Sequence, residues 1–305
     1  MTSAPRAEPT SRQENPTGRA SPYLGIGLAL ALVAAGLLLL VFLGQRRMLY
    51  FPERQLMAAA ERGARAVGLA PWTFEGRFLG WRAPHPSGAA RGRVVVFHGN
   101  AGSALDRAYF RDVFQSPGGP LPVDVYLAEY PGYGPRPGEP SERALVDAAL
   151  EAARTARRDG PGPVILVGES LGSGVAALAA ALDPAAVDGL LLVTPLASVP
   201  AVARRHYGAV PDWLVRDRYA TDVALPRYPG PVGFLVAGRD EVVFPDLGLA
   251  LFDARHGPKR LWLDPAAGHN SLDYDPRLPR WREMLSFLLG APPAVEPSGG
   301  ARPTP

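Results

Sequence analysis

The chain has no cysteine among its 305 residues. This absence excludes disulfides, thiolate metal ligands and a cysteine nucleophile, although it leaves the cellular compartment open. The five histidines are spread along the chain without the spacing of a metal site, and no HExxH, EF-hand, GxGxxG or Walker pattern occurs. The sequence therefore predicts no metal site and implies no cofactor.

The chain also carries little excess positive charge. The formal net charge is only +3, Lys259 is the single lysine, and the chain has neither a basic run nor a stripe of aromatic and basic residues. Nucleic-acid binding needs such an electrostatic footprint, so we expect no nucleic-acid partner. With 47% hydrophobic residues, the chain can form one large core or two small ones.

A long uncharged run lies near the N-terminus. Residues 1–22 are polar and lack periodicity, so we expect a disordered tail there. Residues 23–43, YLGIGLALALVAAGLLLLVFL, carry no charge, and a helix of that length spans about 30 Å, the thickness of a bilayer core. A cleaved signal peptide is the alternative, but the run is long for one and GQRRMLYFPER offers no small-x-small cleavage site. The run predicts a single membrane anchor.

Arginines flank this run on both sides. Three precede it and four follow it, which slightly favours a cytoplasmic location for the residues after the anchor. They are Arg6, Arg12 and Arg19 before the run, and Arg46, Arg47, Arg54 and Arg62 after it.

The rest of the chain, residues 48–290, alternates between strand and helix patterns. Near-continuous apolar runs predict strands at 93–99, 123–130, 163–169, 189–195, 232–238 and 260–265. Helices are expected at 53–69, 103–114, 141–160, 170–182 and 245–257 and before Gly290, with an edge hairpin at 74–83. This alternation predicts an α/β domain with a mostly parallel sheet covered by helices on both faces. The Pro-, Gly- and Ser-rich residues 291–305 predict a second disordered tail.

The most informative local motif is GESLG, Gly168 to Gly172, where a predicted strand turns into a predicted helix. A serine at such a turn adopts a strained backbone, and the flanking glycines let strand and helix approach closely. Its hydroxyl would lie at the N-terminus of a helix, where developing negative charge is favoured. The motif predicts that Ser170 is a nucleophile; an ordinary strand–helix corner with an idle serine is the alternative.

A serine hydroxyl needs a base within reach, and the base needs an orienting acid. Asp240 follows a strand in FLVAGRDEVVFP, and His269 follows the next strand in LWLDPAAGHNSL. Because the carboxyl ends of parallel strands share one edge of a sheet, we expect Ser170, Asp240 and His269 to converge there. Glu241 and Asp264 remain rival acids, although Asp264 is expected to lie on its strand.

The loop HGNAG, residues 98–102, closes an earlier strand with small residues. Such a loop can present backbone N–H groups to an oxyanion, with the N–H of Leu171 as a second donor. We expect His98 to be structural. The later YPGYG sequence predicts a rigid loop over the site. Tyr133 of this loop either contacts substrate or simply packs within the loop.

The segment between Pro195 and Pro231 is short and predicts a cap of one or two helices. A cap this small indicates an open site rather than a deep, covered tunnel. It contains His206, which we expect at the surface, as we do His256 at a helix end.

Together, HGNAG, YPGYG, GESLG, the Asp after VAG, and GHNS resemble the α/β-hydrolase superfamily. The chain is most similar to its membrane-anchored abhydrolase-domain serine hydrolases, the group related to lysophospholipases, monoacylglycerol lipases and palmitoyl-protein thioesterases. The likeness covers residues 48–290. It implies Ser170 as nucleophile, His269 as base and Asp240 as acid, with the backbone N–H groups of Asn100 and Leu171 forming the oxyanion hole.

The sequence thus predicts a membrane-anchored serine hydrolase that cleaves carboxylic esters or thioesters through an acyl-enzyme. A small ester or lipid and the bilayer are the expected partners, and the oligomeric state is left open. Two alternatives remain. One is a serine peptidase of the prolyl-oligopeptidase type, which usually carries a propeller domain for which this chain has no room. The other is a membrane-tethered scaffold without catalysis.

Overall fold

The computed structural model describes residues 22–290, so the tails expected at 1–22, apart from Pro22, and at 291–305 lie outside the described residues. The chain divides into two units, with the boundary between Leu43 and Gly44. Helix α1 (Pro22–Leu49) contains the described part of the first unit and continues into the second.

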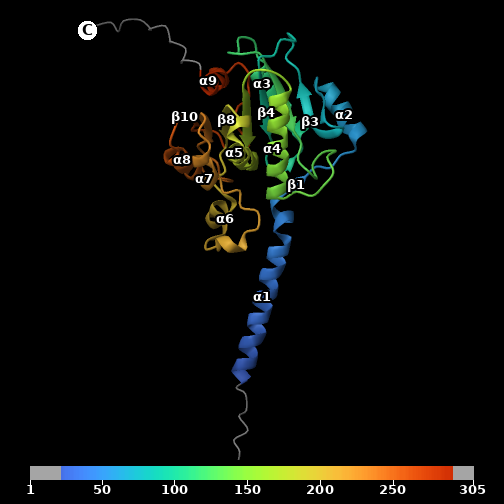
Figure 1. Cartoon of the computed structure of the whole chain (residues 1–305). Coiled ribbons are helices and arrows are strands. Elements are labelled where there is room, and N and C mark those ends of the chain that lie inside the picture. Colours follow the sequence, from blue (N-terminus) through green and yellow to red (C-terminus); the bar gives the residue numbers. More distant parts are fainter. Residues whose placement is uncertain (1–21, 291–305) are drawn as a thin grey trace, which may run out of the picture. The chain divides into compact units, whose positions relative to one another are not determined.

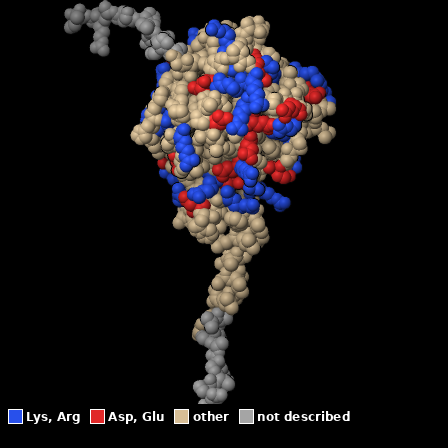
Figure 2. Space-filling view, viewed as in Figure 1, with Lys and Arg blue, Asp and Glu red and all other residues tan. Residues whose placement is uncertain are grey.

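Helix α1 contains the uncharged run. Within the described residues, one helical span, Ile26–Leu49, is long and apolar enough to cross a membrane. Its side chains are largely exposed, and Figure 2 shows no charged side chain along the uncharged part. The helix continues past the predicted end of the run at Leu43 because Gln45, Arg46 and Arg47 are good helix formers, and basic residues near a helix C-terminus interact favourably with its dipole.

An eight-stranded sheet forms the centre of the second unit, in the order β10-β9-β8-β7-β4-β6-β3-β2 (Figure 1). Strands β4 and β6 to β10 are parallel, while β3 is antiparallel to both β6 and β2. The strands are β2 (Ala70–Phe74), β3 (Arg77–Ala83), β4 (Gly92–Phe97), β6 (Val123–Ala128), β7 (Val164–Glu169), β8 (Gly189–Val193), β9 (Val232–Ala237) and β10 (Lys259–Asp264). The predicted α/β architecture with an antiparallel edge hairpin is confirmed.

Helices cover both faces of this sheet. Successive strand residues point to opposite faces, so that Val95 of β4 belongs to one core with α4, α5 and α8, while Val94 and Val96 belong to another with α2, α3 and α9. Figure 1 shows α4 and α5 together over one face. The helices are α2 (Met57–Ala66), α3 (Tyr109–Phe114), α4 (Glu142–Arg158), α5 (Leu171–Leu182), α8 (Pro245–Ala254) and α9 (Pro279–Leu288).

The segment between β8 and β9 forms a small cap, as expected. It contains α6 (Val199–Tyr207), α7 (Thr221–Ala224) and short 3-10 turns at Asp212–Leu214 and Leu225–Arg227. Figure 1 shows α6 lying beyond α7, away from α9.

Two predicted helices are shorter than expected. The one at 53–69 begins only at Met57, because the main-chain N–H groups of Glu53 and Gln55 donate to the carbonyls of Gly102 and Gly134. The residues before them form β1 (Phe51–Pro52), which pairs in parallel with β5 (Ala101–Gly102). The one at 103–114 is divided into a 3-10 turn, Ala104–Arg107, and α3. A capping box between Ser103 and Asp106 begins that turn. The β1–β5 pair was not foreseen, since two-residue strands have no periodicity to detect.

The N-cap of α4 offers a test of local stability. The Ser141 side chain accepts a hydrogen bond from the Ala144 N–H at 3.1 Å. We expect Ser141→Ala to lower the free energy of unfolding by about 1 kcal/mol, because this N–H loses its partner. Urea unfolding of the detergent-solubilised protein measures the loss. Ser286→Ala, within α9, is the control and should cost less than about 0.5 kcal/mol; equal losses would contradict the capping role.

Candidate active site

The turn from β7 into α5 holds Ser170 in an unusual backbone conformation. Its φ of 55° and ψ of −120° lie outside the regions that residues with a Cβ normally occupy. The Ser170 N–H donates to the Val193 carbonyl at 2.9 Å, and the Ser173 hydroxyl donates to the Ser170 carbonyl at 2.6 Å. These bonds from β8 and α5 hold the strained residue in place, and such strain is typical of a functional site.

The glycines of the motif permit this turn because no side chain fits there. A Cβ on Gly168 would overlap the backbone of Gly172 and Ser173, and a Cβ on Gly172 would overlap the carbonyl groups of Phe97 and His98 at the end of β4. Helix α5 therefore begins directly against two strands. The close approach predicted from the sequence is present, and it brings Ser170 next to the loop that follows β4.

Ser170, His269 and Asp240 form a continuous hydrogen-bonded row. The Ser170 Oγ lies 2.9 Å from His269 Nε2, and His269 Nδ1 lies 2.7 Å from Asp240 Oδ2. The three residues follow β7, β10 and β9 at the same edge of the sheet. An imidazole that accepts from a serine and donates to a carboxylate is the arrangement that makes a serine hydroxyl nucleophilic.

Asp240 is suited to remain ionised in this row although its side chain is only 2% exposed. Burial alone raises its pKa, but the hydrogen bond and the charge interaction with His269, together with the N–H groups of Val242 and Val243, outweigh burial and hold the pKa below its usual value. Both N–H groups donate to Oδ1, at 2.8 and 2.9 Å. An ionised Asp240 can only accept from His269 Nδ1–H, which leaves Nε2 free to accept the Ser170 proton.

The loop after β4 lies against Ser170. A Cβ on Gly99 would lie 3.5 Å from the Ser170 Cβ, so the main chain at Gly99 passes beside the serine. The N–H of Leu171 begins α5, and the first N–H groups of a helix have no intrahelical partner. The N–H groups of Asn100 and Leu171 thus come from two elements that meet at the serine.

Residues at the C-terminal end of α1 support this loop, which sequence reasoning missed. Asn100 Nδ2 donates to the Leu49 carbonyl at 2.9 Å, and the Phe51 N–H donates to the Asn100 carbonyl at 2.9 Å. The Tyr133 hydroxyl donates to the same carbonyl at 2.7 Å. Tyr133 is completely buried, so the structure places it beneath the loop and not on the open surface where a substrate would bind.

Glu169, the variable residue of the motif, forms a second supporting network. Its carboxylate accepts from Arg107 Nε and from the hydroxyls of Tyr109 and Tyr274, the latter two at 3.2 and 3.0 Å. Tyr274 belongs to the loop that follows His269, so the network connects the turn at Ser170 with α3 and with the histidine loop. No sequence signal marked these residues, because their partners are distant along the chain.

His98 is buried and both of its ring nitrogens have polar partners, consistent with its expected structural role. Its Nδ1 lies 2.8 Å from the Gly99 carbonyl, and its Nε2 lies 3.2 Å from Glu129 Oε1. Glu129 also accepts from the Ala104 N–H at 3.2 Å. The pair holds the loop after β4 in shape.

The rival acids and bases lie elsewhere. Asp264, at the end of β10, accepts from Arg280 at 3.0 Å, and Glu241 is exposed. His206 lies 3.0 Å from the Val242 carbonyl and His256 is exposed. The row at Ser170 is therefore built from the residues that the sequence favoured.

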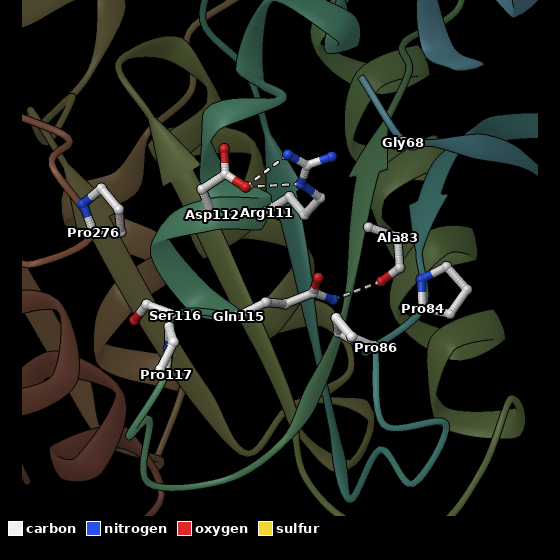
Figure 3. Close-up of a pocket in the computed structure, with 10 residues that line it drawn as sticks. All are labelled: Gly68, Ala83, Pro84, Pro86, Arg111, Asp112, Gln115, Ser116, Pro117 and Pro276. Atoms are coloured by element: carbon white, nitrogen blue, oxygen red, sulfur yellow. Dashed lines mark hydrogen bonds and ion pairs between the residues drawn. The ribbon is translucent and has the colours of Figure 1, made fainter. Parts of the chain in front are cut away.

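A pocket of about 470 Å³ lies away from this row (Figure 3). Gln115, which follows α3, points across it and donates to the Ala83 carbonyl at 2.8 Å. Ala83 pairs with Val125 near the start of β6, so the pocket lies towards the edge where the parallel strands begin, opposite the edge that holds Ser170. The pocket cannot present a substrate to the serine. Its lining is Gly68, Ala83, Pro84, Pro86, Arg111, Asp112, Gln115, Ser116, Pro117 and Pro276.

A mostly parallel sheet with a nucleophile turn between a central strand and a helix defines the class of α/β hydrolases. The sequence pattern of the alpha/beta hydrolase family matches residues 94–300. The chain belongs to this family.

Two relatives extend the likeness over most of the chain. An uncharacterized protein of Mycobacterium tuberculosis is 35% identical over 277 residues, which cover 88% of this chain and 94% of that protein. The alpha/beta hydrolase domain-containing protein 17C of Xenopus laevis is 30% identical over 253 residues, covering 79% of this chain and 76% of that protein.

Solved structures of esterases share the fold. Est1E of Butyrivibrio proteoclasticus superposes with a TM-score of 0.59 at 16% identity, covering 73% of this chain and 99% of that chain. An esterase of Pyrococcus furiosus gives 0.57 at 14% identity, covering 79% and 97%. The protein is therefore an α/β hydrolase that is structurally like esterases.

Ionisation of Asp240 makes the stability depend on pH in a testable way. Because its pKa is lower in the folded than in the unfolded chain, its stabilising contribution is complete above the unfolded pKa of about 4 and is lost as the pH falls through the folded value. We expect the free energy of unfolding to decrease less steeply in Asp240→Asn than in the wild type between about pH 5 and pH 2. Urea unfolding at a series of pH values measures the slope.

The control is Asp147→Asn, since Asp147 is a largely exposed carboxylate on α4. This variant should keep the wild-type slope. Identical slopes for the wild type and Asp240→Asn would contradict the lowered pKa.

Proposed function

We propose that the protein is a membrane-anchored serine hydrolase that cleaves carboxylic ester or thioester bonds through an acyl-enzyme. The observation that carries the proposal is the row in which Ser170 Oγ lies 2.9 Å from His269 Nε2 and His269 Nδ1 lies 2.7 Å from Asp240. Residues far apart in the sequence would have no structural need to meet in this order and geometry.

In the proposed reaction, Ser170 Oγ attacks the acyl carbon while His269 Nε2 takes its proton. The carbonyl electron pair moves onto oxygen, and the N–H groups of Asn100 and Leu171 stabilise the oxyanion. His269 then gives the proton to the departing alcohol or thiol, which leaves the acyl group on Ser170. A water that loses its proton to His269 releases the carboxylic acid and restores the serine.

The proposed anchor is residues 23–43, which form a long run for a signal peptide and are followed by no small-x-small cleavage site. Leu49 and Phe51 are the main-chain partners of Asn100. Cleavage beyond Phe51 would remove the support of the proposed oxyanion loop. We keep the cytoplasmic location of the hydrolase unit as a proposal, on the small excess of arginines after the run.

Ester or acyl-lipid substrates fit both the anchor and the open site. An anchor holds the hydrolase unit at a bilayer, where long-chain acyl groups are concentrated. We expect the small cap, which contains only α6, α7 and two 3-10 turns, to let a substrate approach from the side. The esterases that share the fold support a carboxylic ester as the bond cleaved.

A fluorophosphonate probe tests the nucleophile. We expect the full-length protein to be labelled and Ser170→Ala to lose labelling completely, because no other side chain would be activated. Ester hydrolysis by this variant should fall by about four orders of magnitude or more. Ser116→Ala, a serine remote from the row, should be labelled like the wild type.

No labelling of folded wild-type protein would support the scaffold alternative. Labelling that persists in Ser170→Ala would mean that another residue is the nucleophile.

The dependence of activity on the length of the acyl chain tests the substrate class. We expect kcat/KM on p-nitrophenyl esters to rise by about tenfold or more from acetate to a medium or long chain, because each buried methylene adds about 0.8 kcal/mol of transfer free energy. Steady-state rates of the wild type, corrected with Ser170→Ala, measure the trend. Best activity on acetate, with none on longer chains, would remove the lipid assignment and leave a small-ester hydrolase.

A further inference from the structure

The cap is bonded directly to the residues that follow the uncharged run. Gln45 Nε2 donates to the Leu214 carbonyl at 2.8 Å, and the Arg216 N–H donates to Gln45 Oε1 at 3.0 Å. Arg46 Nε pairs with Asp217 at 2.8 Å. Cap residues on either side of Val215 are therefore held against the helix, just after Leu43.

If residues 23–43 span a bilayer, this attachment determines how far the cap lies from the hydrocarbon core. The inference therefore rests on the proposed anchor. A helix rises about 1.5 Å per residue, which places Gln45 about 3 Å along the helix from Leu43. The polar layer of a bilayer is about 5–7 Å thick on each side of the hydrocarbon core. A segment hydrogen-bonded to Gln45 consequently lies within the polar layer.

The side chains displayed there are those that favour this layer. Trp213, the neighbour of Leu214, is 79% exposed, and Tyr207 at the end of α6 is 75% exposed. Trp and Tyr are enriched at membrane–water interfaces, where the ring meets acyl chains and the polar atom meets headgroups.

The charge around these rings is complementary to phospholipid phosphates. The segment between Val199 and Tyr219 contains four arginines and only two aspartates. Arg204 and Arg218 pair with Asp212, the neighbour of Trp213, and Arg205 pairs with Asp246 at 2.8 Å. Arg47, next to Arg46, is also exposed.

We infer that Tyr207 and Trp213, the aromatic cap edge, insert into the headgroup layer of the bilayer that α1 anchors. The occupant of this surface is a phospholipid bilayer, since Trp213 is the neighbour of Leu214, which Gln45 holds, and the edge carries both interfacial aromatics and arginines. The edge also connects to the reaction site. His206, beside Tyr207, lies 3.0 Å from the Val242 carbonyl, and the Val242 N–H donates to Asp240. Through these contacts the docked cap is joined to the residues that hold Asp240.

Tryptophan quenching tests this inference. The full-length protein is reconstituted in vesicles of phosphatidylcholine with a minority of phosphatidylglycerol, the phosphatidylcholine being brominated near the headgroup end of its acyl chains. Three of the other tryptophans, Trp72, Trp81 and Trp281, are at most 3% exposed. We expect the bromines to quench Trp213, and Trp213→Phe to lose most of the quenched fluorescence.

Trp262→Phe is the matched control, because Trp262 is half-buried on the edge strand β10. This variant should retain the quenched fraction. Equal quenching of the wild type and Trp213→Phe, with the protein still in the vesicles, would overturn the inference. Loss of the protein from the vesicles would instead show that the proposed anchor is wrong.

Activity provides a second readout. We expect Trp213→Ala to lower hydrolysis of an ester embedded in these vesicles by about tenfold while leaving hydrolysis of a soluble p-nitrophenyl ester in detergent unchanged. Unchanged soluble activity shows that the variant is folded. Equal effects of the substitution on both substrates would contradict a membrane role for the cap edge. Inactivity of the wild type on both substrates would contradict the proposed hydrolase function and not the proposed membrane contact.

Discussion

The contact between the start of α5 and the end of β4 is the constraint on which the site depends. Gly168 and Gly172 have no space for a Cβ, because the backbone of β7, α5 and β4 meets there. Within that approach Ser170 has its positive φ, and the loop at Gly99 passes beside the serine. One backbone contact thus determines the conformation of the serine and brings the loop after β4 next to it.

Support for the site is distributed among segments that are distant in the sequence. Glu169 joins the serine turn to α3 and to Tyr274 in the histidine loop, while the main chain at Leu49 and Phe51 holds Asn100. The residues that adjoin the uncharged run therefore contribute to the geometry around the serine. The proposed anchor and the proposed chemistry therefore share helix α1, whose last residue, Leu49, accepts a hydrogen bond from Asn100.

Patterns of hydrophobicity made much of the fold predictable. The β4, β7 and β9 runs are continuous and apolar because both faces of the sheet are covered, and Ser141 marked the start of α4 by its capping chemistry. The short β1–β5 pair escaped prediction since its hydrogen bonds join main-chain atoms of any residue type. The sequence left open whether Tyr133 contacts substrate or packs, because a tyrosine in a Gly- and Pro-rich loop has the same sequence whether it lies above or below the loop.

By itself, the sequence determined the α/β alternation, the uncharged run and the three polar residues that follow separate strands. These features follow from local periodicity and from the rule that parallel strands end at one edge. Only the tertiary structure decided that Asp240, and not Asp264, faces His269, and that Gln45 and Arg46 hold the cap. Such choices depend on the direction of side chains in space, which sequence separation leaves undetermined.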